Sequence, residues 1–119
     1  MISMIDTVLS ALKNDSSITA LVSNRVYWIR PAGTPTYPYI TFSEVTNSEA
    51  QSADDEEYSD DIEIQVDIWA KASTIPIAKA VQKVMRGLGF THQAQADDYS
   101  DTTQIFHKPI RFMGEFPST

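Results

Sequence analysis

The chain has 119 residues, no cysteine and a formal net charge of -7, with 16 Asp and Glu against 9 Lys and Arg. This length predicts one domain, 1–119, with a single core that needs no metal or disulfide staple. The composition excludes thiol nucleophiles and zinc fingers and argues against nucleic acid as a primary partner, and no apolar run approaches the ~20 residues of a membrane span, so we expect a soluble intracellular protein.

The first third of the chain predicts two short helical segments and a strand. Apolar residues recur at helical spacing over 2–13, which predicts an amphipathic helix. Asp15 or Ser16 can cap a second, shorter helical turn, and residues 26–29 form a brief strand. The segment 31–38 holds three prolines and a glycine, so we expect a loop there.

The two clearest strands cover 39–45 and 61–69. In the second, Ile62 and every second residue up to Ile68 are apolar, so one face of this strand lies in the core and the other is wet. The fifteen residues between the strands are polar and include six acids. They predict a long flexible acidic loop, 46–60, that joins two antiparallel strands.

A second principal helix follows. Ser73 or Thr74 can cap it, Pro76 falls in its first turn, and Gly87 or Gly89 ends it. A strand is expected over residues 90–96, a turn over 97–101, and a last strand from Thr103 to about Phe116.

Pro109 interrupts the last strand and suggests an edge position or a bulge. The order of elements predicts an α+β fold: a mainly antiparallel sheet with two principal helices packed on one face and a long acidic loop between two central strands.

The residues offer little for catalysis. His92 and His107 are the only histidines, and a third metal ligand would have to come from an aspartate within 97–101. That acidic run imitates the start of a calcium loop, but Thr102 stands where the loop requires glycine. Glycine-rich phosphate loops, GxSxG and HExxH are absent from the sequence. We therefore expect no enzyme, no cofactor and no metal site.

Charge is separated along the chain. Nine acids fall between Glu49 and Asp67, whereas Lys79, Lys83 and Arg86 are spaced to line one stripe of the second principal helix. This stripe is either an ordinary solvated helix face or a docking surface. In the second interpretation, the acidic loop of one copy reaches the basic helix of another in a head-to-tail ring.

Aromatic residues give a second hint. Trp69 lies in phase with the polar face of its strand, so it is either covered by its neighbours or offered to a partner, and Tyr27, Tyr37 and Tyr39 cluster around the proline-rich loop. The hypothetical interface consists of Asp54, Asp55, Glu56, Glu57, Asp60, Asp61, Trp69, Lys79, Lys83 and Arg86.

Four features in order carry a family resemblance. They are Pro38 and Tyr39 before a strand, an alternating strand that ends in Trp69, a helix a few residues later, and a closing strand around residues 110–112. Together they resemble the tail completion proteins of long-tailed phages, also called tail-to-head joining proteins, over about residues 3–116.

The resemblance implies a virion structural protein, similar in fold to tail terminators and encoded by a phage or prophage. Such a protein forms a ring of six at the head-proximal end of the tail, completes the tail and joins it to the head connector. The implied partners are further copies, the tail tube protein and the connector or stopper protein; DNA only passes through the bore, and no membrane is involved. The protein would be monomeric in the host cytoplasm before it assembles into the virion.

Two other functions remain open from the residues. A small acidic adaptor without catalytic activity could dock a basic partner through the loop, and an enzyme could use the histidines with residues 97–101. Assembly on a tail tube separates a ring protein from an adaptor, because an adaptor binds one defined partner at low stoichiometry.

Overall fold

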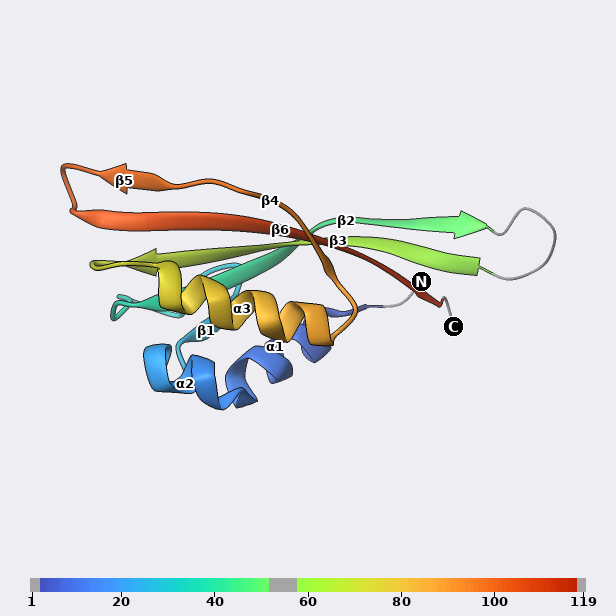
Figure 1. Cartoon of the computed structure of the whole chain (residues 1–119), viewed down its shortest axis with the longest axis horizontal. Helices are drawn as coiled ribbons and strands as arrows, with labels where there is room; N and C mark the ends of the chain where they lie inside the picture. The colour runs from blue at the N-terminus through green and yellow to red at the C-terminus, as the bar shows by residue number, and fades with distance from the viewer. Residues whose placement is uncertain (1–2, 52–57, 118–119) are drawn as a thin grey trace.

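The computed structural model describes residues 3–51 and 58–117, which form a six-stranded sheet with helices on one face (Figure 1). Along the chain the elements are α1 (Ile5–Asn14), α2 (Ser16–Val22), β1 (Val26–Trp28), β2 (Tyr39–Gln51), β3 (Tyr58–Ala70), α3 (Ile75–Gly87), β4 (Thr91–Gln95), β5 (Asp98–Ser100) and β6 (Ile105–Pro117).

The sheet has the order β1-β2-β3-β6-β4, with β5 pairing to β6 on the same side as β4. Every pairing is antiparallel except that of β1 with β2, which is parallel. The predicted α+β fold with a mainly antiparallel sheet is therefore confirmed, and α2 joins the two principal helices as a third helix.

The core lies between the helices and one face of the sheet. Alternate residues of β3 from Ile62 to Ile68 are fully buried, as their spacing predicted. They pack in one cluster with side chains of all three helices, among them Leu12, Ile18 and Val81. Each buried side chain of this size contributes roughly 1.5–3 kcal/mol through removal of apolar surface from water.

The helix starts follow the predicted capping chemistry. The Asp15 carboxylate accepts a hydrogen bond from the Ile18 amide at 3.1 Å and so caps α2. At α3 the Ile75 amide donates to Ser73 Oγ at 3.3 Å, while the Thr74 side chain makes no capping bond. Pro76 lies in the first turn, where its missing N–H costs little.

The hairpin of β2 and β3 is longer than the sequence suggested. Strand pairing continues through Asn47 opposite Ile62 and Ser48 opposite Asp61, so the strands occupy both ends of the segment expected as a loop over 46–60. Antiparallel pairing satisfies the main-chain groups whatever the side chains are, which allows polar residues to extend a ladder. Residues 52–57 lie outside the described part of the chain.

Two predictions in the C-terminal third are wrong. The turn expected over 97–101 contains the short strand β5. Pro109 lies within a central strand, since β6 pairs with β3 on one side and with β4 and β5 on the other. The Pro109 carbonyl accepts from the Ala96 amide at 3.2 Å, so its main-chain groups face the interval between β4 and β5, where a missing N–H interrupts no ladder.

The molecule is elongated, with extents of 53 × 26 × 25 Å. The hairpin of β2 and β3 projects past the helices at one end, and β5 with the start of β6 projects past them at the other (Figure 1). Within the described ranges, none of the helices is long and apolar enough to span a membrane. One face of the sheet, which we call the open face, is left uncovered by the helices (Figure 1).

Candidate interaction surfaces

A row of stacked rings crosses the open face. Tyr39 on β2, Trp69 on β3 and His107 on β6 are direct cross-strand neighbours. The Tyr39 and Trp69 ring centroids are 6.1 Å apart with planes at 15°, and those of Trp69 and His107 are 3.9 Å apart with planes at 2°. Each ring thus covers part of the next, and Trp69 is half-buried by its own neighbours.

Hydrogen bonds fix the orientation of this row. Trp69 Nε1 donates to Thr41 Oγ1 at 3.0 Å. His107 Nε2 lies 2.7 Å from Asp67 Oδ1, and the same carboxylate oxygen accepts from Gln65 Nε2 at 3.0 Å. The imidazole is therefore held between an indole face and a carboxylate, with little freedom to rotate.

The network continues along β3 toward the hairpin. Arg111 Nε donates to Gln65 Oε1 at 3.0 Å, and its Nη1 lies 3.1 Å from Glu63 Oε1. A hollow of about 280 Å³ adjoins these groups and is bounded by Gln65, His107, Pro109 and Arg111 together with the end of β4. The central open face is therefore a polar surface whose charges are largely paired within the chain.

The tyrosines beside the proline-rich loop pack against the row. The Tyr37 ring lies 5.2 Å from that of Tyr39, and Tyr27 meets Tyr39 edge-on at 6.2 Å. Lys71 Nζ lies 5.0 Å from the Tyr37 ring centroid. Burial raises the pKa of Tyr39 to about 12, with a further contribution from the neighbouring Tyr37 hydroxyl. These contacts pin the loop to the sheet.

The basic stripe predicted on the second principal helix is present. Lys79, Lys83 and Arg86 are all exposed on α3. Across the part of the chain that the structure describes, none of the three has an ion-pair partner. The stripe therefore carries three charges that the described residues leave without an ion pair.

The acids predicted to meet this stripe have different environments. Asp60 is fully buried on the helix-facing side of β3, so it is not the exposed loop residue that the sequence suggested, because β3 begins earlier than expected. Asp61 is half-buried on the open face, directly opposite Glu115 of β6. Like charges so placed repel one another. Asp54, Asp55, Glu56 and Glu57 lie outside the described residues.

The two histidines do not converge. His92 on β4 lies opposite Phe112, whereas His107 lies five positions earlier on β6, on the order of 16 Å away along the strand. Asp97 is engaged by Lys108 Nζ at 2.7 Å. Within residues 3–51 and 58–117, no three acids or histidines are placed to hold a metal ion together.

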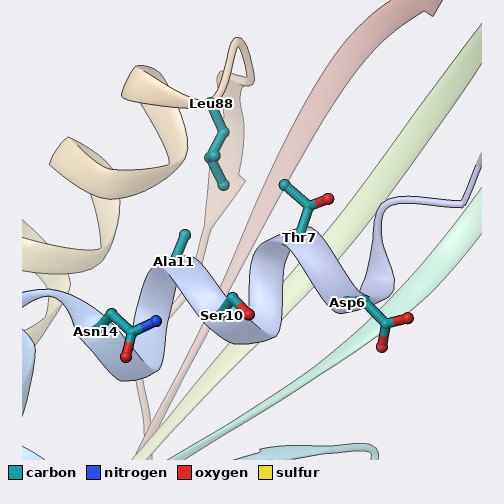
Figure 2. Close-up of a pocket in the computed structure, with 6 residues that line it drawn as sticks. All are labelled: Asp6, Thr7, Ser10, Ala11, Asn14 and Leu88. Carbon is teal, nitrogen blue, oxygen red and sulfur yellow. The ribbon is translucent and has the colours of Figure 1, made fainter.

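A second hollow lies between α1 and Leu88, the residue that follows α3. It measures about 550 Å³ and is bounded by one side of α1 and by Leu88 (Figure 2). Figure 2 shows Thr7, Ser10 and Ala11 along the helix, with Asp6 and Asn14 at its two ends. These groups are small or amide side chains with a single carboxylate, so the hollow lacks an acid-base pair or a nucleophile held by a base.

Sequence reasoning missed the pairing of His107 with Asp67 and that of Arg111 with Glu63. The alternation of β3 places Asp67 and Glu63 on the wet face, but only the register of β3 against β6 shows which residues they meet. The surface features are thus a ring row, a paired polar network and a basic stripe that has no ion-pair partner among the described residues.

Comparisons with known proteins agree with this description. The family model described as tail completion protein gp17 matches residues 6–113. A chain of the "Virion of native gene transfer agent (GTA) particle" superposes with a TM-score of 0.69 at 15% sequence identity, covering 93% of this chain and 92% of that one, which shows a shared fold. A search of curated proteins gives no match. The chain belongs to the tail completion protein gp17 family and is a structural protein of a virion tail.

Proposed function

We propose that this protein forms a ring at the head-proximal end of the tail, where it completes the tail and joins it to the head connector. The observation that carries the proposal is the family match over residues 6–113. The proposed partners are further copies of the chain, six to a ring, together with the tail tube protein and the connector or stopper protein. The chain assembles from monomers in the host cytoplasm, and DNA passes through the bore.

The shape and charge of the monomer support a ring. The hairpin of β2 and β3 projects from one end of a 53 Å long molecule, and its Asp61 lies directly opposite a second acid, Glu115 of β6. The basic stripe of Lys79, Lys83 and Arg86 on α3 lacks an acidic partner in the described chain. Contact between the hairpin of one copy and the stripe of the next relieves both imbalances.

Asp60 does not belong to the proposed contact. Its carboxylate is fully buried, so it serves the fold of the hairpin. On the acidic side the contact comprises Asp54, Asp55, Glu56, Glu57 and Asp61. Trp69 and its ring row on the open face form a second surface, which we assign to the tail tube or the connector.

The experiment is electron microscopy of particles from a host in which only this gene is missing. We expect filled heads separate from free tails, and joined particles after purified protein is added. Overlong tails would assign the protein to termination of tail growth instead. Intact virions in the deletion would contradict the proposal and favour the acidic adaptor that docks a basic partner.

Charge reversal tests the proposed contact. A variant with Lys79→Glu, Lys83→Glu and Arg86→Glu should fold normally, since all three side chains are exposed, and should lose at least about tenfold in joining. Lys13→Glu, at an exposed position of α1, is the matched control for loss of positive charge. Unchanged joining by the triple variant would remove the basic stripe from the ring contact.

A further inference from the structure

Exposed apolar side chains gather at the two opposite edges of the sheet. At the end of β1, Trp28 and Ile29 are 50% and 57% exposed. On the other side, Ile75, Tyr99 and Phe106 are 59%, 44% and 38% exposed. Strands β2, β3 and β6 separate β1 from β5, a span of roughly 19 Å at about 4.8 Å per strand. A chain therefore cannot bring its own Trp28 to its own β5.

The edge at β5 contains a hollow. It measures about 610 Å³ and lies between the start of α3, with Ser73 and Ile75, and the start of β6, with Phe106 and Lys108. The Phe106 ring packs on Tyr99 with centroids 4.6 Å apart. Ile75 and Phe106 line this hollow together with polar and charged side chains. The exposed Ile75, Phe106 and neighbouring Tyr99 form an apolar patch of the kind that receives a large side chain from a partner.

The two edges carry opposite charge. Residues 16–43 contain two arginines and no acid, while residues 96–104 contain three aspartates and no lysine or arginine. Asp97 forms an ion pair with Lys108. Asp98, which lines the hollow, and Asp101, three residues further along the chain, are both exposed. Arg30 is exposed at the β1 edge and has no ion-pair partner within the described ranges.

Both edges present their apolar groups on the same side of the sheet. Trp28 lies opposite Phe42, and Phe106 lies opposite Ala70. Phe42 and Ala70 are buried beneath the helices. A contact between the two edges would therefore place the helices of both copies on the same side of the joined sheets.

We propose that the corner Trp28 to Arg30 of one copy docks at the β5 edge of the next copy. Trp28 enters the hollow between α3 and β6, Ile29 covers Phe106 and Tyr99, and Arg30 pairs with Asp98 and Asp101. The inference rests on the proposed ring and names a contact within it that differs from the hairpin contact. Because the two patches are different, each copy uses both, and successive contacts close into a ring.

Cysteine cross-linking tests the contact directly, since the natural chain has no cysteine. Arg30→Cys combined with Asp98→Cys changes two exposed residues. A disulfide requires Cα atoms about 4.4–6.8 Å apart. The two edges of one chain are too far apart for this, so any disulfide between the two cysteines must join different copies. In completed particles under oxidation we expect a ladder of linked oligomers that ends at the ring number. Each single variant is the control and should give no ladder.

The outcomes separate this contact from the proposed function. Completed particles without a ladder would overturn the contact and leave the ring role intact. Cross-linked pairs from one single variant alone would show that like patches meet, which also overturns it. If separate heads and tails are absent from the gene deletion, the ring role itself fails.

If the double-cysteine variant does not complete particles, exchange of charge between Arg30 and the two aspartates tests the same contact. Arg30→Glu, or Asp98→Arg with Asp101→Arg, should each reduce joining by at least about tenfold, and the combined variant should recover most of that loss. Trp28→Ala should reduce joining to a similar extent in a chain that remains folded by circular dichroism. Failure of the combined variant to exceed either parent would overturn the pairing of Arg30.

Discussion

Replacement of Trp69 tests whether the ring row stabilises the open face. Trp69→Ala removes the stacks on Tyr39 and His107 and the hydrogen bond to Thr41. Truncation of a fully buried aromatic side chain costs about 3–5 kcal/mol. Since Trp69 is only half-buried, we expect the free energy of unfolding to fall by about 2–3 kcal/mol.

Trp69→Phe separates the two contributions. Phenylalanine keeps a ring between Tyr39 and His107 but loses the N–H that bonds Thr41 Oγ1, so its cost should be about 1 kcal/mol. Urea unfolding followed by far-ultraviolet circular dichroism gives both values without relying on tryptophan emission. A cost below about 1 kcal/mol for Trp69→Ala, or equal costs for the two variants, would refute a stabilising role for the stacked row.

The same variants bear on association. The Trp69→Phe chain should remain folded, yet we expect it to join heads and tails at least about tenfold less well than the unchanged chain, because the ring also forms part of the proposed docking face. Thr41→Val, which removes the same hydrogen bond while leaving the indole in place, is the matched control. Equal joining by Trp69→Phe and the unchanged chain would confine Trp69 to the fold of the monomer.

Three further changes test the fold and its titration. Gly114→Ala should cost about 1–3 kcal/mol, because a Cβ there would lie 2.5 Å from the Phe116 ring, which must move; thermal unfolding measures the loss. Gly87→Ala has open space around its Cβ and should instead stabilise α3 by about 0.5 kcal/mol in the same assay. For Tyr39, whose folded pKa of about 12 exceeds the unfolded value of 10.0, the contribution to stability is complete below pH 10 and lost as pH rises toward 12. Alkaline unfolding should therefore shift to higher pH in Tyr39→Phe.

The sequence predicted those parts of the fold that follow from local periodicity. The alternation of Ile62 to Ile68 identified the buried face of β3, and helical spacing identified α1 and α3, because burial on one side imposes a period on the residues themselves. The polar residues that alternate with Ile62 to Ile68 predict the open face. Trp69 is in phase with these polar residues, and it lies on that uncovered side.

The register of pairing between strands that lie far apart in the chain could not be predicted from the sequence. The extension of the hairpin, the burial of Asp60 and the central position of Pro109 all depend on which main-chain groups a neighbouring strand satisfies. The pairing of His107 with Asp67 depends on it too. A polar or imino residue gives no local sign of its partner, so the sequence alone predicts a loop over 46–60 and an edge position or a bulge at Pro109.

The residues that stabilise the fold and the residues proposed to associate with other proteins lie in different parts of the molecule. The large side chains that are fully buried gather between the helices and one face of the sheet, so stability resides there. The basic stripe of α3, the opposed acids Asp61 and Glu115 and the two apolar edges lie outside that core. Substitutions at Lys83, Arg30 or Asp98 should therefore change joining at nearly constant unfolding free energy, whereas those at Ile64 should change both. This division is consistent with the proposed assembly from monomers, because exposed charge disfavours contact of the edges with wrong partners while the fold stays intact.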